Sequence, residues 1–376
     1  MSFFNNTIYK IGSYEIYFDI ILGSGNYSNV YLGKCTNIDI INKYNISKTA
    51  YISNKRESGI VAIKKIKINE LSSKTKKAIL TEIDIMNEIK ENPHPNIVSC
   101  YDIIDDIDTK YIILEYCECG DFSNLIGKPM KEESVRYYLK QLIDGMKYLD
   151  DEKIIHRDIK PKNLLLTDNK KILKICDFGL AKKTEMSRIH TMCGSPLYMA
   201  PEIFRDKSYD KSSNLWPLGM IMYEMLFGEN PFRGINDFKV LEAHLLNEKN
   251  NIKIPPENNK NKNISNDCLD LLRKLLEKNI EKRISLDDLY DHPWIKNPNN
   301  IIHSIKLNKT IKPKKVNKNI PIPINKNSKN NLKNIFHNIS SFEKNNKNIN
   351  SIDNNNNDDT NDYDDNNLLF DYDNDN

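Results

Sequence analysis

Glycine is scarce in this sequence and unevenly spread. Only 13 of the 376 residues are glycine, about half of the usual share, and none follows Gly234. No stretch approaches the run of about 18 apolar residues that a membrane-spanning helix needs. The N terminus also lacks the basic and apolar regions of a signal peptide. We therefore expect an intracellular protein without a membrane span.

Cysteine is also infrequent, with 7 residues, and none belongs to a Cys-x-x-Cys motif or a Cys/His cluster. An odd number of scattered cysteines disfavours a disulfide framework and a zinc site. The cysteine pattern predicts a reducing, cytoplasmic environment.

Neither sign of charge dominates, because 55 basic residues face 52 acidic ones and the net charge is +3. Composition therefore predicts no nucleic-acid partner. Hydrophobic residues make up 39% of the chain, which is enough to fill the core of a large domain.

Strand patterns and helix patterns occupy different parts of the chain. Residues 14–22, 29–35, 59–68 and 110–117 carry β-branched and aromatic runs typical of strands. Between them, residues 75–90 place Ile79, Ile83, Met86 and Ile89 at helical spacing. Helical patterns dominate from about residue 122, most clearly at 134–149, 215–228, 268–278 and 285–295. The sequence predicts an α+β fold in which a small β-rich part precedes a larger helical part.

Three segments lie outside this pattern. Residues 1–13 are an N-terminal extension, and the polar residues 36–58 are expected to form an inserted surface loop. Residues 299–376 are rich in Asn, Lys, Ile and Asp and predict a disordered, low-complexity tail. The tail is basic up to about Lys347 and acidic after Asp353, which favours a solvated, self-neutralising segment. Partner docking through Leu368, Leu369 and Phe370 is the alternative.

A glycine-rich turn joins the first two strand patterns at Gly23 and Gly25. Without Cβ atoms, such a turn allows backbone N–H groups to approach a polyphosphate closely. The motif is weak evidence, because most Gly-x-Gly turns only reverse the chain. Downstream, Lys64 lies on a strand that is otherwise suited to burial, so its ammonium needs an anionic partner. Glu82, on the helix that follows, is the natural candidate.

A more specific motif spans residues 154–163, where Asp158, Lys160 and Asn163 share one loop that begins Ile-Ile-His-Arg-Asp. Asp177-Phe178-Gly179 and Ala200-Pro201-Glu202 follow in order. With these motifs, residues 14–298 resemble the eukaryotic protein kinases. The resemblance implies a bilobal kinase fold, with a small antiparallel sheet at 14–114, a hinge at 115–121 and a mainly helical lobe at 122–298.

The resemblance also implies a role for each motif residue. Asp158 would orient the substrate hydroxyl and accept its proton, and Lys160 would stabilise the transferring phosphoryl group. Asn163 and Asp177 would hold Mg²⁺, and Lys64, held by Glu82, would bind the phosphates of ATP. The remaining positions implied for the nucleotide are Leu22, Gly23, Ser24, Gly25, Asn26, Tyr27, Ser28, Val30, Ala62, Leu114, Glu115, Cys117 and Leu165. An apolar residue at these positions could equally belong to the core.

Several residues indicate the kind of kinase. Lys160 and the segment 194–202 resemble serine/threonine kinases, which implies Ser and Thr acceptors in protein substrates. Ser195 could bridge Asp158 and Lys160. Arg157 precedes the catalytic aspartate, an arrangement that implies regulation by a phosphorylated activation loop. Thr191 is the best-placed acceptor, and Thr184 and Ser187 are alternatives.

Residues 191–203 and 226–232 look most like the autophagy-initiating, Unc-51-like kinases. The positive charge of Lys162 would repel an arginine three residues before the acceptor, so we expect no preference for such substrates. Glu202 and Arg283 are expected to form an ion pair. Asn214 stands where the family usually has aspartate, and this departure motivates the alternative of a pseudokinase scaffold. Because Lys64, Asp158 and the other residues of the chemistry are present, an active enzyme is favoured.

Overall fold

The computed structural model describes residues 8–25, 27–52, 55–69, 71–183, 193–206, 211–235, 237–247, 249–254 and 264–296. All of them belong to one compact unit. The expected tail at 299–376 lies outside the described residues, as do Asn26 and Thr191. No helix in the described ranges is long and apolar enough to cross a membrane.

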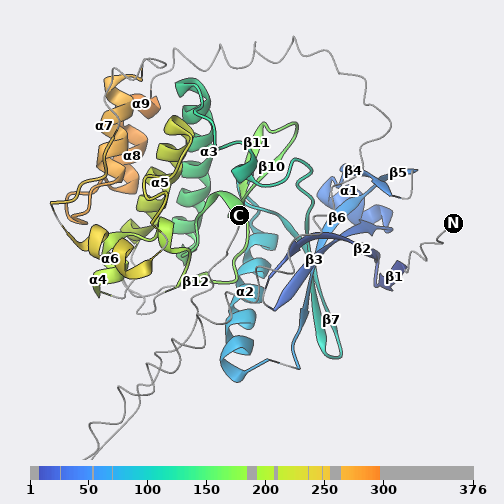
Figure 1. Cartoon of the computed structure of the whole chain (residues 1–376). Coiled ribbons are helices and arrows are strands. Elements are labelled where there is room, and N and C mark those ends of the chain that lie inside the picture. Colours follow the sequence, from blue (N-terminus) through green and yellow to red (C-terminus); the bar gives the residue numbers. More distant parts are fainter. Residues whose placement is uncertain are drawn as a thin grey trace, which may run out of the picture. The chain divides into compact units, whose positions relative to one another are not determined.

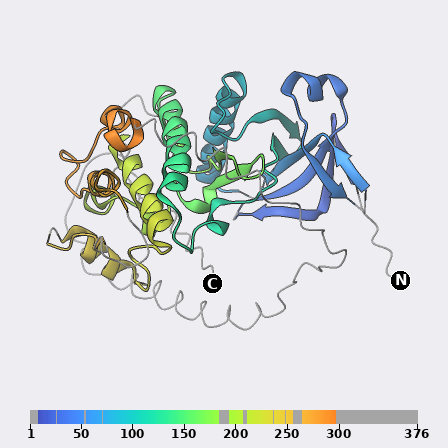
Figure 2. The ribbon, with the colours of Figure 1, turned by 90° about the horizontal axis from the view of Figure 1, so that it is seen from above.

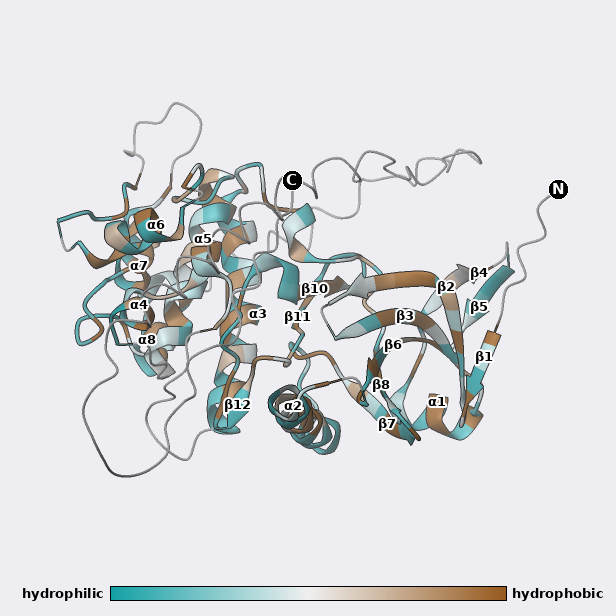
Figure 3. Cartoon of the chain, turned by 60° about the horizontal axis from the view of Figure 1, so that its bottom comes forward, coloured by the Kyte–Doolittle hydropathy of each residue, from teal (hydrophilic) through white to brown (hydrophobic). Residues whose placement is uncertain are grey.

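A six-stranded antiparallel sheet forms the first lobe, with the strand order β1-β2-β3-β6-β8-β7 (Figure 1). The strands are β1 (Ile8–Ile11), β2 (Tyr14–Ser24), β3 (Ser28–Cys35), β6 (Ile60–Lys67), β7 (Cys100–Asp106) and β8 (Thr109–Glu115). Both hydrophobic and hydrophilic positions occur along β2 and β3 (Figure 3). On β6, Val61 and Ile63 are fully buried in the core beside Tyr14 and Tyr111.

Helix α2 (Ser73–Glu91) packs against the sheet beside β7. Ser72 caps its N terminus by accepting a hydrogen bond from the Thr75 backbone N–H at 3.2 Å. The helix predicted from the spacing of its isoleucines is confirmed, since Ile79, Ile83, Met86 and Ile89 are all buried. Glu82 lies on the same helix and is also buried, with 5% of its surface exposed.

Two segments differ from the expectations. The N-terminal extension contributes β1, which pairs with β2 from Ile8 opposite Tyr17 to Ile11 opposite Tyr14, so the sheet begins before residue 14. The segment 36–58 is not an irregular loop, because it forms α1 (Ile38–Tyr44) and the hairpin β4 (Thr49–Ile52) and β5 (Lys55–Ser58). Its apolar residues decide this, since Ile46 is 98% buried in the core of the lobe.

The second lobe is mainly helical. Its helices are α3 (Glu132–Asp151), α4 (Pro201–Asp206), α5 (Leu215–Phe227), α6 (Phe238–Leu246), α7 (Asn266–Leu275), α8 (Leu286–Asp291) and α9 (Pro293–Lys296). Two short ribbons pair β9 (Ile154–Ile155) with β12 (Lys182–Lys183) and β10 (Leu164–Thr167) with β11 (Ile172–Ile175). Figure 2 shows this helical part beside the sheet. The α+β fold predicted from the sequence is confirmed.

Helix α5 forms the centre of the helical lobe, and nearly all of its residues are buried. A Cβ atom on Gly219 would lie only 2.8 Å from the side chain of Leu276, so glycine permits the close approach of α7. Pro217 lies in the first turn, where its missing N–H breaks no intrahelical hydrogen bond. The expected ion pair of Glu202 and Arg283 is confirmed, with two contacts of 2.6 and 2.8 Å between fully or almost fully buried side chains.

Candidate active site

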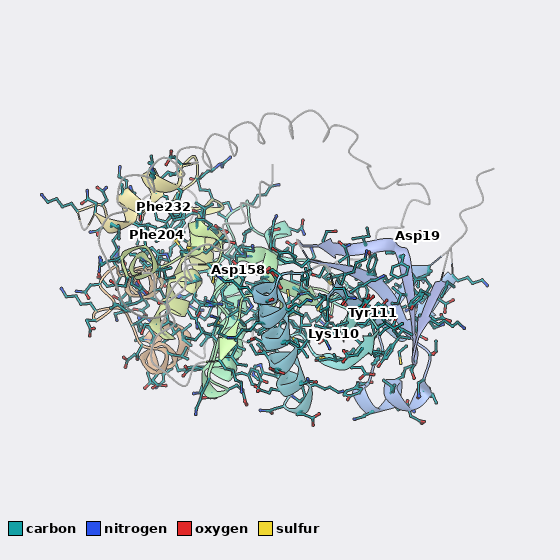
Figure 4. All side chains as sticks on the ribbon, turned by 90° about the horizontal axis from the view of Figure 1, so that it is seen from below. Asp19, Lys110, Tyr111, Asp158, Phe204 and Phe232 are labelled. Carbon is teal, nitrogen blue, oxygen red and sulfur yellow. The ribbon has the colours of Figure 1, made fainter. Side chains whose placement is uncertain are left out.

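Asp158 lies between the sheet that carries Tyr111 and the part of the helical lobe that carries Phe204, on α4, and Phe232, between α5 and α6 (Figure 4). Its carboxylate is held by several donors. Ser195 donates to Oδ1 from its hydroxyl at 2.9 Å and from its backbone N–H at 3.0 Å. The Lys160 ammonium lies 3.2 Å from Oδ2 and donates to the Ser195 hydroxyl at 2.8 Å. Ser195 therefore bridges Asp158 and Lys160, as expected from the sequence.

Asn163 fixes the other side of this carboxylate. Its side-chain N–H₂ group donates to Asp158 Oδ2 and to the Asp158 backbone oxygen, both at 2.9 Å. Its backbone oxygen accepts the N–H of Cys176 at 2.9 Å, which ties the loop to the residue just before Asp177. The structure thus brings Asp158, Lys160 and Asn163 together.

The buried His156 makes a second link between these segments, which the sequence reasoning missed. Its Nδ1 accepts the backbone N–H of Asp158 at 3.3 Å, so Nε2 carries the proton and donates to the Cys176 oxygen at 3.0 Å. Burial lowers the pKa of the imidazole, which keeps it neutral at pH 7. A histidine two residues before Asp158 was visible in the sequence, but its burial was not.

Lys64 connects β6 to α2 and to Asp177. Its ammonium lies 2.5 Å from Glu82 Oε1 and 3.5 Å from Asp177 Oδ1. Burial alone would lower the pKa of Lys64, but the two carboxylates more than offset this and raise it above its ordinary value. The Lys64 ammonium in turn holds the pKa of Asp177 below its ordinary range. Lys64 and Asp177 are therefore both charged at neutral pH.

The strand register places Lys64 on the same face of the sheet as the apolar residues that the sequence analysis assigned to the nucleotide. Val30 lies opposite Lys64, and Ala62 lies opposite Leu114. Because alternate residues of a strand share a face, these four side chains project from the same face of the sheet. Leu165 lies on β10 in the other lobe and is partly buried.

The glycine turn between β2 and β3 leaves open space. A Cβ atom on Gly23 would meet nothing within 4 Å, and one on Gly25 would meet only Ser28 at 3.7 Å. The Gly25 N–H donates to the Ser28 oxygen at 2.8 Å and closes the turn. Leu22 and Tyr27 are 41% and 43% exposed, and Ser24 is exposed, so the turn offers an accessible surface.

The hinge residues differ in where their side chains point. Glu115 is turned into the protein, where its carboxylate lies 2.8 Å from the Lys174 ammonium. The Cys117 side chain is buried, and burial raises the pKa of its thiol. Lys174 was missed by sequence reasoning, although a lysine in an otherwise apolar strand was the same signal that identified Lys64.

Asp177 and Arg157 both have backbone angles that are uncommon outside glycine, with φ of 65° and 67°. Non-glycine residues in this region are strained and concentrate at functional sites. Arg157 Nε donates to the Leu180 oxygen at 2.6 Å, within the segment that follows Asp177. Thr191, the proposed regulatory acceptor, lies outside the described residues.

Asn214 is the N-cap of α5, but its side chain makes no capping hydrogen bond. It lines a small pocket together with Arg157, Asp158 and Ser195. Asn214 therefore lies next to the loop that carries Asp158.

Asp177 and Asn163 are suitable ligands for Mg²⁺. The Asp177 carboxylate is ionised and 51% exposed. Asn163 uses its N–H₂ group for Asp158, and in the described part of the chain no hydrogen bond reaches its side-chain oxygen. Mg²⁺ commonly takes one or two protein oxygens and completes its shell with phosphate and water. Among the described residues, no group of three or more His, Cys, Asp or Glu side chains could hold a metal ion.

Comparison with known proteins supports the same family. A family model of the protein kinase domain matches residues 45–295. The serine/threonine-protein kinase atg1 of Dictyostelium discoideum is 44% identical over 250 residues, which cover 64% of this chain and 36% of the relative. ATG1a of Arabidopsis thaliana is 37% identical over 257 residues, covering 67% and 40%. ULK3 of Homo sapiens is 36% identical over 278 residues, covering 73% and 53%.

The chain spans 36% to 53% of the length of these relatives. Their names confirm the resemblance to the autophagy-type, Unc-51-like serine/threonine kinases. Since the family model covers the segments that carry Lys64, Asp158 and Asp177, the chain belongs to the protein kinase family.

Proposed function

We propose that this protein is an active serine/threonine kinase that transfers the γ-phosphate of ATP to Ser or Thr hydroxyls of protein substrates. The observation that carries the proposal is the intact network around Asp158, in which Lys160, Asn163 and Ser195 all contact its carboxylate or each other. The contacts of the Lys64 ammonium with Glu82, also in the first lobe, and with Asp177, in the second lobe, support it.

In the proposed reaction, the acceptor oxygen forms a bond to the γ-phosphorus while the bond from phosphorus to the β,γ-bridging oxygen breaks. Asp158 takes the proton of the hydroxyl, and ADP departs with the electron pair of the broken bond. Lys160 lies beside Asp158 and stabilises the negative charge of the phosphoryl group. Mg²⁺, held by Asp177 and Asn163, would neutralise charge on the β- and γ-phosphates.

ATP would lie between the lobes, with its adenine against Val30, Ala62, Leu114 and Leu165 and the backbone of 115–117. The glycine turn at 22–28 would cover the phosphates, and Lys64 would contact the α- and β-phosphates. The exposed turn and the shared face of Val30, Ala62 and Lys64 support this arrangement. In this proposal the kinase domain extends to about residue 298, and its sheet includes β1.

The proposal is tested by transfer of radiolabelled phosphate from ATP to a mixture of Ser/Thr peptides, with Asp158→Asn as the comparison. We expect incorporation by the wild-type protein and a loss of at least about a hundredfold in the variant. Equal signals from the two proteins, or no signal from either, would favour the pseudokinase scaffold that Asn214 suggests.

We further propose that phosphorylation of Thr191 activates the enzyme through Arg157. A phosphate at this position would pair with the guanidinium and order the activation segment. Thr191→Ala is expected to lower kcat markedly, and mass spectrometry should find the phosphate on Thr191 in active wild-type protein. Wild-type turnover by the unphosphorylated variant would refute this regulation.

The cellular setting is part of the same proposal. All seven cysteines are free thiols, which fits a reducing cytoplasm. Docking of a protein partner through Leu368, Leu369 and Phe370 remains a hypothesis on residues that the structure does not describe.

A further inference from the structure

The segment 36–58 makes a contact that crosses between the lobes. Lys48, in the turn between α1 and β4, places its ammonium 3.1 Å from the carboxylate of the hinge residue Glu118. The same ammonium donates to the hydroxyl of Thr167, at the end of β10 in the helical lobe. One side chain of the inserted segment therefore contacts both the hinge and the second lobe.

Glu118 is the centre of this contact. Its carboxylate also accepts the Thr167 hydroxyl at 2.6 Å and the Asp168 backbone N–H at 2.8 Å. Burial by itself would raise the pKa of Glu118, but the hydrogen bonds from Thr167, from its own backbone and from Lys48 hold it below the ordinary value. Glu118 is therefore ionised at neutral pH and joins the hinge to β10. Its ion pair with Lys48 also links the hinge to the inserted segment of the first lobe.

An apolar contact reinforces the polar one. Ile52 of β4 is buried with Tyr17 and Leu32 of the strands that flank the glycine turn, and Tyr116 of the hinge packs against this cluster. The inserted hairpin thus belongs to an apolar cluster that also contacts the hinge through Tyr116, two residues before Glu118. The segment 36–58, expected from the sequence to be a polar surface loop, therefore contacts the hinge, whose backbone is proposed to bind adenine.

We propose that Lys48 is a positioning residue, which fixes the hinge relative to both lobes and so strengthens nucleotide binding. The inference rests on the proposed function for the identity of the nucleotide. Lys48 is expected to act through Glu118, because none of its contacts described above is with a residue assigned to the nucleotide. Without the Lys48 ammonium, Glu118 would keep its bonds to Thr167 and Asp168 but lose its link to the inserted segment. The hinge would then open more often, and ADP would dissociate faster.

A second ion pair, between Lys34 of β3 and Glu57 of the inserted segment, provides a matched control. Lys34 and Glu57 lie 2.7 Å apart with exposed fractions of 28% and 29%, close to the 24% and 30% of Lys48 and Glu118. Both residues of the control pair belong to the first lobe, on β3 and β5. Lys34→Ala therefore removes a similar ion pair without removing a contact between the lobes.

The experiment compares Lys48→Ala, Lys48→Arg and Lys34→Ala in the full-length protein. Calorimetry with ADP and Mg²⁺ measures affinity, and hydrogen exchange followed by mass spectrometry measures opening of the hinge peptide around residues 115–121. For Lys48→Ala we expect ADP affinity to fall about 3- to 10-fold and hinge exchange to accelerate by a similar factor, in keeping with a partly exposed ion pair. Lys48→Arg should restore most of both, and Lys34→Ala should change neither.

The charge-exchanged double variant Lys48→Glu with Glu118→Lys gives an independent check. It should recover part of the ADP affinity lost in Lys48→Ala if the two charges act on each other. Unchanged affinity and hinge exchange in Lys48→Ala, or equal effects of Lys34→Ala, would overturn the proposal. Failure of the proposed function has a different signature, because wild-type protein would then bind no ADP while hinge exchange would still respond to Lys48.

Discussion

Removal of the Ser195 hydroxyl is expected to weaken catalysis while leaving the fold intact. Ser195→Ala deletes the 2.9 Å hydrogen bond to Asp158 Oδ1 and the acceptor of the Lys160 ammonium at 2.8 Å. A hydrogen bond to a charged group contributes about 1.5 to 3 kcal/mol. The backbone N–H of Ser195 and the Asn163 side chain continue to hold Asp158. We therefore take the lower part of that range, which corresponds to a fall in kcat of about 10- to 30-fold.

Steady-state kinetics with a Ser/Thr peptide provide the assay. The loss should be in kcat, with the KM for ATP nearly unchanged, because the contacts of Ser195 described above are to the catalytic loop and not to residues assigned to the nucleotide. Ser195→Thr retains a hydroxyl and is the matched control, expected to stay within about threefold of the wild type. The reasoning is wrong if Ser195→Ala turns over as fast as the wild type, or if Ser195→Thr is equally impaired. Thermal unfolding of both variants checks that the domain remains folded.

Three further predictions concern stability, nucleotide binding and substrate choice. Glu202→Gln breaks a buried ion pair and should lower the free energy of unfolding, measured by urea denaturation, by about 3 to 5 kcal/mol. The exposed pair Glu229–Arg233, 3.3 Å apart, is the control. Glu229→Gln should change the free energy of unfolding by less than about 0.5 kcal/mol. Glu82→Gln should lower kcat/KM for ATP by at least about tenfold, because a neutral amide holds the Lys64 ammonium less strongly than a carboxylate does. Kinetics at varied ATP concentration measure this, and an unchanged kcat/KM would contradict the prediction. A peptide array should show no preference for arginine three residues before the acceptor, since the exposed Lys162 would repel it; selection of such peptides would refute that role.

Much of the fold could be predicted because the spacing of apolar residues within short segments indicates their secondary structure. The spacing of Ile79, Ile83, Met86 and Ile89 defined α2, and the apolar run at 215–228 defined the buried α5. Local patterns failed where few apolar residues are set among polar ones. In the segment 36–58, Ile46 and Ile52 were too isolated to indicate a helix and a hairpin, although both are buried in the structure.

Some residues of the candidate site could also be predicted from the sequence, whereas the surroundings of others could not. The order of the motifs and the need of a strand lysine for a carboxylate identified Asp158, Asp177, Lys64 and Glu82 from the sequence. The burial of His156 could not be foreseen, because burial depends on neighbours that are distant in the chain.

The sequence by itself determined which residue types carry the chemistry and in which order they occur, because motifs and periodicities are local properties. Only the tertiary structure decided which charges meet. The chain has 55 basic and 52 acidic residues, and no local rule pairs Lys48 with Glu118, 70 residues away, or Lys174 with Glu115. Those pairs form because the packing of the inserted segment and of β11 brings their charges to the hinge, where partial burial makes an unpaired charge unfavourable.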